Sequence, residues 1–249
     1  MSKMDTLTYV LIAGGGLVSG VLSGMSGGGG GMLMVPLFIF LGIPPQNAVA
    51  TGKMNGLGAA FGGLSVFART GHIRKDILKV MIPVAVVVGV VTPFAFNAID
   101  SKSFQIVLAV ILLVLTPTLF IRKKIISQPS RKHKIAGYSA YSGVLTMQAI
   151  FGTGVGSLAM FVLTLMLGTT KLEANATKRA VNAVLTPITF VALLISGYVL
   201  LSYGIVGMIA VFIGTHLGSK IAIKQGERFA TYSMAVVVVI AAVILLLTA

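Results

Sequence analysis

Residues 27–31 are five consecutive glycines set between apolar stretches. Such a run cannot hold a helix, because glycine loses the most backbone entropy on ordering and leaves its amides bare. Bilayer hydrocarbon does not satisfy free N–H and C=O groups, so a non-helical break at membrane depth must be buried in protein or line a wet cavity. The run therefore predicts a broken helix of the kind that forms transporter substrate sites.

The composition supports the membrane interpretation. The chain has 249 residues, of which 56% are hydrophobic and 10% charged, and its mean hydropathy is +1.01. Apolar runs long enough to cross a bilayer recur along it, which predicts a multi-pass helical membrane protein. The net charge of +14 sits in short loops between apolar runs, so it reports topology and not nucleic-acid binding. Apolar sequence after Lys3 predicts a retained first helix.

A short helix is expected directly after the glycine run. Residues 31–41 would form a helix of about 17 Å, well short of the roughly 30 Å of bilayer hydrocarbon. Gly42 and Pro44 end it, so it is a half-helix. Before the break, glycines at four-residue spacing (Gly16, Gly20) predict close approach by another helix. Longer apolar helices are expected at about 7–25, 49–68, 77–98, 104–121, 136–151, 176–196, 205–219 and 229–247.

The second half of the chain repeats the first at a shift of 126 residues. This shift maps Gly28 and Gly30 onto Gly154 and Gly156, Leu41-Gly42 onto Leu167-Gly168, Ala50-Thr51 onto Ala176-Thr177, and Lys53 onto Arg179. The second break is then 152–156, followed by a half-helix at 157–167. We expect a first transmembrane repeat at 1–121, a basic cytoplasmic linker at 122–135, and a second repeat at 136–249, all forming one integral membrane domain.

The distribution of cations predicts the topology. The loops at 69–79, 122–134, 171–179 and 220–228 hold 16 of the 19 Lys and Arg residues, which places them in the cytoplasm by the positive-inside rule. The first glycine hairpin then opens outward, the second inward, and both termini lie outside, although Lys3 favours the opposite side. The predicted fold class is an all-α polytopic membrane protein of two inverted repeats, each a Gly-broken re-entrant helix hairpin plus three transmembrane helices.

The breaks are the predicted substrate site. Half-helices starting at Gly30 and Gly156 would point free amides at a cavity, which suits an anion; the alternative is tight packing of the hairpin tips without a ligand. A cation at the centre of a span costs roughly 2.5–3.5 kcal/mol on insertion scales, but near a helix end it can snorkel to the headgroups. Snorkelling is favoured for Arg179, whereas for Lys53 snorkelling and substrate attraction are evenly balanced.

The full set of candidate substrate-binding residues combines these cations with the glycines and with amide and hydroxyl groups near the breaks. They are Gly28, Gly29, Gly30, Gly31, Thr51, Lys53, Asn55, Gln148, Thr153, Gly154, Gly156, Ser157, Thr177, Arg179 and Asn182. For the uncharged side chains, bonding between helices is an equally good interpretation.

The scarcity of acidic residues excludes several functions. The five carboxylates and the absence of cysteine leave no mid-span ligand set for a metal, so no metal or other cofactor is expected. The same scarcity argues against proton coupling through a carboxylate. No catalytic constellation is apparent, so we do not expect an enzyme. His216 lies within a late span and is expected to be a packing residue.

Several segments of the chain resemble the sulfite exporter TauE/SafE family, also called the 4-toluenesulfonate uptake permease family. They are the polyglycine break, the half-helix containing Pro36, the segments Gly42-Ile43-Pro44-Pro45 and Ala48-Val49-Ala50-Thr51, and the weaker copy at 152–177. The resemblance covers essentially the whole chain. Two departures are Gly52-Lys53 after the first Ala-Thr and Lys178-Arg179 after the second.

The resemblance implies a permease of the inner (cytoplasmic) membrane that moves small sulfur-containing anions such as sulfite or an organosulfonate. An anion channel, and a carrier for other small organic anions such as carboxylates, are the alternatives. The expected partners are a small anionic substrate and the lipid bilayer, with no nucleic acid. The sequence does not determine the oligomeric state, the coupling ion or the direction of transport.

Overall fold

The computed structural model describes residues 3–26, 31–100, 102–104, 106–107, 110, 130–152 and 155–225. Within these ranges the regular structure is entirely helical. The helices are α1 (Lys3–Ser26), α2 (Gly31–Phe40), α3 (Pro45–Phe67), α4 (Lys75–Asn97), α6 (Arg131–Phe151), α7 (Gly156–Leu165), α8 (Lys171–Ile195) and α9 (Leu201–Gln225). Helices α1, α4, α8 and α9 are long and apolar enough to cross a membrane, so this is a multi-pass membrane protein.

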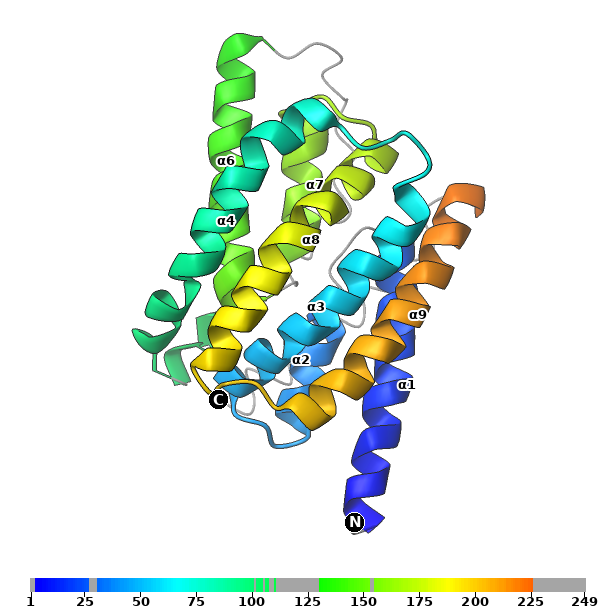
Figure 1. The fold of residues 1–249 in the computed structure, drawn as a ribbon, viewed down its shortest axis with the longest axis vertical. Coiled ribbons are helices and arrows are strands. Elements are labelled where there is room, and N and C mark those ends of the chain that lie inside the picture. Colours follow the sequence, from blue (N-terminus) through cyan, green and yellow to red (C-terminus); the bar gives the residue numbers. More distant parts are fainter. Residues whose placement is uncertain are drawn as a thin grey trace.

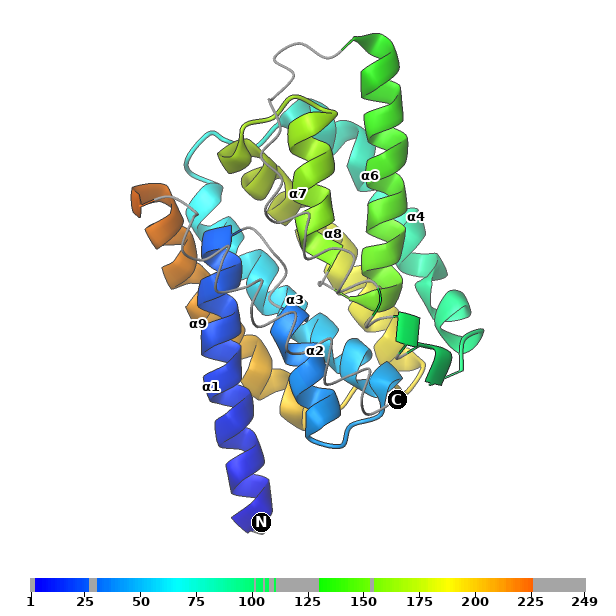
Figure 2. The same cartoon turned by 180° about the vertical axis from the view of Figure 1, so that it is seen from behind.

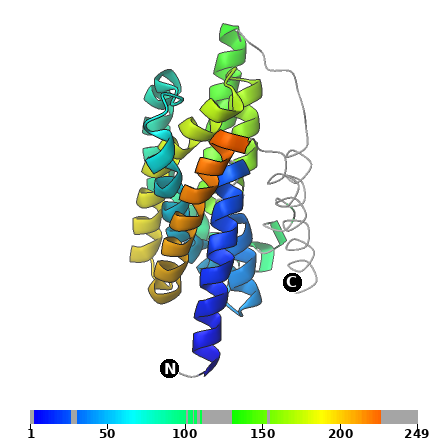
Figure 3. The same cartoon turned by 90° about the vertical axis from the view of Figure 1, so that its right-hand side faces the viewer.

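Helices α3 and α8 form the centre of the molecule. They lie side by side and run in opposite directions (Figure 1). Helix α9 packs along α3 and against α1, whereas α4 packs along α8 and against α6 (Figure 2). The edge-on view shows the long helices packed closely along one another (Figure 3). Each half of the chain therefore packs mainly on helices of the other half, so the two halves share one core.

The two short helices carry the turns that lead into the central pair. Helices α2 and α7 each have 10 residues, or about 15 Å, and cannot cross a bilayer alone. Both end at a turn that contains a glycine with positive φ, Gly42 at 84° and Gly168 at 68°. The α2–α3 and α7–α8 turns lie at opposite ends of the molecule (Figure 1). The expected short helices at 31–41 and 157–167 are thus confirmed to within two residues.

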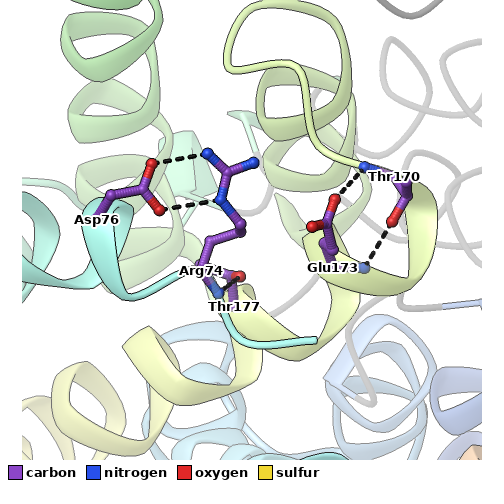
Figure 4. Close-up of polar contacts among 5 residues, drawn as sticks. All are labelled: Arg74, Asp76, Thr170, Glu173 and Thr177. Carbon is purple, nitrogen blue, oxygen red and sulfur yellow. Dashed lines mark hydrogen bonds and ion pairs between the residues drawn. The ribbon is translucent and has the colours of Figure 1, made fainter. Parts of the chain in front are cut away.

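The central helices begin earlier than the apolar pattern predicted. Helix α3 starts at Pro45, where proline is favoured because its missing N–H is not needed. Helix α8 starts at Lys171, after a capping box in which Thr170 and Glu173 exchange hydrogen bonds at 3.2 and 2.8 Å (Figure 4).

One further prediction differs from the structure, and two lie wholly or mostly outside the described residues. Helix α6 begins at Arg131, so the last residues of the range predicted as a linker are helical. The expected span at 229–247 and most of that at 104–121 lie outside the described residues.

Helices α1 and α9 approach closely through glycines on both sides. A Cβ added at Gly20 would lie 2.6 Å from the carbonyl oxygen of Val211, and one at Gly24 would lie 2.6 Å from the amide nitrogen of Ser219. On the α9 side, Gly218 packs against the backbone of α1. The predicted close approach of a second helix to the glycine face of α1 is confirmed.

Candidate functional site

A band of buried polar side chains runs through the central helix pair. Its members are Thr51, Lys53 and Asn55 on α3, Gln148 on α6, and Asn175, Thr177, Lys178, Arg179, Asn182, Thr186 and Thr189 on α8, each at most 7% exposed. The buried polar residues of the described ranges include no aspartate or glutamate. The band therefore carries three cations and no carboxylate that could neutralise them.

Lys53 binds the end of α6. Its side chain is 3% exposed, and Nζ donates to the carbonyl oxygens of Gln148 at 2.8 Å and Ala149 at 2.6 Å. These carbonyls belong to the last turn of α6, where the helix carries partial negative charge, and the Gln148 oxygen also accepts from the Gly152 amide at 3.0 Å. The helix ends there because Gly152, with φ of 96°, breaks it. Lys53 thus caps the helix that leads into the second glycine break.

A small gap lies beside the Lys53 ammonium. It is lined by Lys53, Gln148, Ala149, Leu185, Thr186 and Thr189, and it is too narrow to admit a water molecule. A lysine ammonium has three N–H bonds, and two of them are used on the α6 carbonyls. The side-chain oxygen of Gln148 is also buried and has no hydrogen-bond partner. One N–H of the Lys53 ammonium and the side-chain oxygen of Gln148 therefore lie next to the second glycine break without a hydrogen-bond partner among the described residues.

Arg179 binds the end of α1 in a similar way. Its guanidinium donates to the carbonyl oxygen of Ser23 at 2.8 Å, in the last turn before the first glycine run. It also donates to the carbonyl oxygen of Ala59 at 2.7 Å and to Oδ1 of Asn175 at 2.9 Å. The ring of Phe67 lies 5.9 Å from Cζ. The favoured expectation that Arg179 snorkels to the cytoplasmic face is wrong, because the side chain is 4% exposed.

The two cations make reciprocal contacts. Lys53 and Arg179 are 126 residues apart in the sequence, and so are their carbonyl partners Ala149 and Ser23. Each half of the chain thus supplies a cation to the end of the helix that precedes the other half's glycine break.

The two buried threonines make a second reciprocal pair of contacts. The hydroxyl of Thr177 accepts from the amide of Arg74 at 3.0 Å, between α8 and the α3–α4 turn (Figure 4). The hydroxyl of Thr51 accepts from the amide of Leu200 at 3.0 Å, between α3 and the α8–α9 turn. The residues in each role are again 126 positions apart. Beside Thr177, Arg74 also forms an ion pair with Asp76 at 2.7 Å (Figure 4).

The remaining predicted site residues divide into three groups. Asn55 is fully buried beside Gly207 of α9, and neither atom of its amide has a hydrogen-bond partner; the amide oxygen of Asn182 is likewise unpartnered. Gly31, Gly156 and Ser157 lie in the first turns of α2 and α7. Gly28, Gly29, Gly30, Thr153 and Gly154 lie outside the described residues.

The predicted site did not include four buried residues of the band. Asn175 accepts from Arg179, Thr186 and Thr189 line the gap beside Lys53, and Lys178 is 4% exposed next to Arg179. The two threonines follow Arg179 by about two and about three turns of α8, so their helical spacing from it was the available signal. In the described part of the chain no three His, Asp or Glu residues are placed to hold a metal ion. His216 contacts the Ser65 hydroxyl at 2.8 Å, in keeping with the expected packing role.

Comparison with known proteins gives matches over most of the chain. The family model described as sulfite exporter TauE/SafE matches residues 12–245. A probable membrane transporter protein of Haemophilus influenzae is 25% identical over 206 residues, which cover 80% of each chain. A probable membrane transporter protein, ORF9, of a Sinorhizobium species is 24% identical over 89% of this chain and 85% of its own. The Escherichia coli probable membrane transporter protein YfcA is 21% identical over 81% and 76%. No solved structure gives a significant match.

Proposed function

This chain belongs to the sulfite exporter TauE/SafE family, and we propose that it carries small sulfur-containing anions, such as sulfite or an organosulfonate, across the cytoplasmic membrane. Family membership and the transporter relatives identify a membrane transporter and not an enzyme. The anion is held between the two halves of the chain, next to the glycine breaks. Lys53 is its principal contact.

The buried and incompletely bonded amino group of Lys53 is the observation that carries this proposal. A charged group away from water is costly unless a countercharge or hydrogen bonds compensate it. The two α6 carbonyls offer partial compensation, and no buried carboxylate in the described ranges adds to it. A bound anion would complete the coordination of the ammonium. A cation would meet three buried positive groups and be repelled.

The helix break next to Lys53 supplies further donors of the right kind. Helix α7 begins at Gly156, four residues after the Gly152 that ends α6. The first amides of a helix have no partner within it and carry its positive dipole end, which favours an anion. The side-chain amide of Gln148 and the hydroxyls of Thr186 and Thr189 lie around the same gap. Oxygens of a sulfite or sulfonate group can accept from the helix amides, the Gln148 amide N–H groups and the Thr186 hydroxyl, whereas the Thr189 hydroxyl donates to the carbonyl oxygen of Leu185 at 2.8 Å.

Two inverted repeats would give this site access to both sides of the membrane. The reciprocal contacts of Lys53 and Arg179, and of Thr51 and Thr177, support a duplication with a shift of 126 residues. The opposite placement of the α2–α3 and α7–α8 turns supports an inverted arrangement with two re-entrant hairpins (Figure 1). Rocking of one repeat against the other then exposes the site first to one side and then to the other.

Counterflow in proteoliposomes tests the proposal. Purified protein is reconstituted and assayed with labelled sulfite, thiosulfate, sulfate, methanesulfonate and simple carboxylates. A carrier gives saturable uptake that preloaded unlabelled anion accelerates, whereas a channel gives macroscopic current without counterflow. We expect counterflow with a sulfur-containing anion. Counterflow with carboxylates alone would overturn the substrate class, and the absence of counterflow with every anion would overturn the carrier.

A matched pair of lysine variants tests the site. Lys53→Ala should lower uptake at least about tenfold, because loss of one charge-assisted contact is worth about 1.5–3 kcal/mol. Lys102→Ala removes an exposed lysine and should leave uptake unchanged. Equal uptake by the two variants would remove Lys53 from the site.

A further inference from the structure

We infer that Lys53 is also the proton carrier of the transport cycle, so that each anion crosses together with one proton bound to the Lys53 amine. This inference rests on the proposed anion transport and adds its coupling ion. It comes from the contacts of Lys53 and from the difference between Lys53 and Arg179, which occupy equivalent positions 126 residues apart. The scarcity of carboxylates does not prevent such coupling, because the proton is bound to the amine nitrogen of Lys53.

The contacts of Lys53 can survive the loss of a proton. An ammonium has three N–H bonds and a neutral amine has two. Lys53 Nζ donates to two acceptors, the carbonyl oxygens of Gln148 and Ala149. The neutral amine can therefore still cap α6, and the proton that is lost is the one directed away from both carbonyls. That third N–H is also the one available to an anion when the site opens at the gap beside Thr186 and Thr189, which is closed to water in this conformation.

The surroundings of the amine offer no other titratable side chain for proton exchange, so the proton is exchanged with water on the side where the site is open. The residues lining the gap, from α3, α6 and α8, include no titratable group other than Lys53 itself. Other titratable or charged residues whose side chains are described, on the helices packed against α3 and on α6, do not line the gap. They are Tyr9 on α1, Lys171, Glu173, Lys178 and Arg179 on α8, Tyr203, His216 and Lys220 on α9, and Arg131, Lys132, His133, Lys134, Tyr138 and Tyr141 on α6.

The chemistry of the two cations makes Lys53 the member that can exchange a proton. Buried lysine can lose its proton, whereas a guanidinium stays charged. Arg179 is bound by three hydrogen bonds and keeps a fixed charge. The empty site with a neutral Lys53 amine and the loaded site with an ammonium beside a monovalent anion carry the same net charge. Neither form leaves an additional unbalanced charge in the core during reorientation.

The resulting cycle conserves protons and charge. The neutral amine takes one proton from water on the side where the site is open, and the ammonium binds the anion. The site reorients with ammonium and anion together. The anion leaves on the other side and the ammonium gives its proton to water there, which restores the amine. One proton moves with each monovalent anion, so transport is electroneutral and a pH difference drives accumulation.

Proteoliposomes with a pH difference test the inference. The probe is labelled methanesulfonate, or another monovalent sulfonate if methanesulfonate shows no counterflow, because a sulfonate carries one negative charge and no titratable proton near neutral pH. Wild-type protein should accumulate the probe inside alkaline vesicles about tenfold for one unit of pH difference, since one proton per monovalent anion transmits the tenfold proton gradient. A membrane potential at equal pH should drive no accumulation of methanesulfonate.

Two exchanged cations provide the matched control. Lys53→Arg keeps a cation that cannot release a proton, so it should retain counterflow and lose accumulation driven by the pH difference. Lys102→Arg makes the same exchange at an exposed lysine and should retain both. Accumulation driven by pH in Lys53→Arg would overturn the inference, and so would wild-type counterflow with no response to pH. Absence of counterflow by wild type for every anion would instead overturn the proposed function on which the inference rests.

A binding measurement keeps the inference testable if Lys53→Arg does not fold. Wild-type protein in weakly buffered detergent solution should take up about one proton for each methanesulfonate bound at a pH where the amine is neutral, read with a pH-sensitive dye. Lys53→Gln, which has no titratable group, should take up none. Wild-type binding without proton uptake at any pH between about 6 and about 10, a range that brackets the titration of a buried lysine, would overturn the inference.

Discussion

A buried cation from the other half of the chain binds the end of α1 and the end of α6, but the two cations differ in their surrounding contacts. Arg179 binds the α1 end through one hydrogen bond, to the carbonyl oxygen of Ser23, and is itself held by two more, to Ala59 and Asn175, by an aromatic ring at 5.9 Å and by close packing on Gly63. Lys53 closes the α6 end with two hydrogen bonds beside a gap lined by threonines. The difference indicates that one helix end is fixed in the structure, whereas the other keeps a donor for a ligand.

The helix neighbours show the same contrast. Helix α1 presents Gly20 and Gly24 to α9, with backbone against backbone. The positions 126 residues later on α6 are Thr146 and Ile150. Thr146 is exposed among the described residues, and its hydroxyl donates to the carbonyl oxygen of Ser142 on its own helix. The α1–α9 interface is therefore tighter than the packing at the equivalent face of α6, and movement of the α6 end requires less repacking.

Removal of Arg179 should have the largest effect on stability. Arg179→Ala leaves three acceptors without their donor and opens a cavity, and we expect the free energy of unfolding to fall by about 2–5 kcal/mol. Lys53→Ala should cost less, because it removes two hydrogen bonds in place of three and a smaller side chain. Thermal unfolding in detergent, followed by circular dichroism, measures both. A larger loss for Lys53→Ala would reverse the assignment of the fixed and ligand-binding ends.

Lys53 and Arg179 show which features of the site could be predicted from the sequence and which could not. Helix breaks at glycine runs and the equivalence of Lys53 with Arg179 could be predicted, because both follow from the local residue pattern and the 126-residue spacing. The depth of the cations could not. Helices predicted to begin at 49 and 176 would leave both near a helix end, whereas α3 and α8 begin at Pro45 and Lys171, so each cation lies eight residues, or about 12 Å, inside.

The partners of the cations had no sequence signal. Lys53 binds backbone carbonyls at 148 and 149, and Arg179 binds those of Ser23 and Ala59. Every residue presents the same backbone carbonyl whatever its side chain, so only the packing of one half on the other selects these. The unpartnered amide of Asn55 was predicted as a ligand contact, and its place beside Gly207 also follows from tertiary packing alone.

The tight interface should be more sensitive than its equivalent on α6. Gly20→Ala places a methyl group 2.6 Å from the Val211 carbonyl oxygen and 2.9 Å from the Gly214 Cα, so the helices must separate, at about 1–3 kcal/mol. Thr146→Ala, at the equivalent position, removes an exposed hydroxyl and should change stability by less than about 0.5 kcal/mol. Both are measured by thermal unfolding. If Gly20→Ala is as mild as Thr146→Ala, the two interfaces do not differ in tightness.

The threonine contacts should give the smallest effects and nearly equal ones. Thr51→Val and Thr177→Val each remove the acceptor of one loop amide, that of Leu200 or Arg74, at about 0.5–1.5 kcal/mol. The ion pair of Arg74 with Asp76 adds little to the second loop, because its side chains are 34% and 55% exposed and such pairs contribute about 0.2–1 kcal/mol. Thermal unfolding of both variants at low and high salt separates the terms. Equal losses that do not depend on salt would show that the threonine contacts are equivalent while the cation contacts are not, which confines the difference between the halves to the ends of α1 and α6.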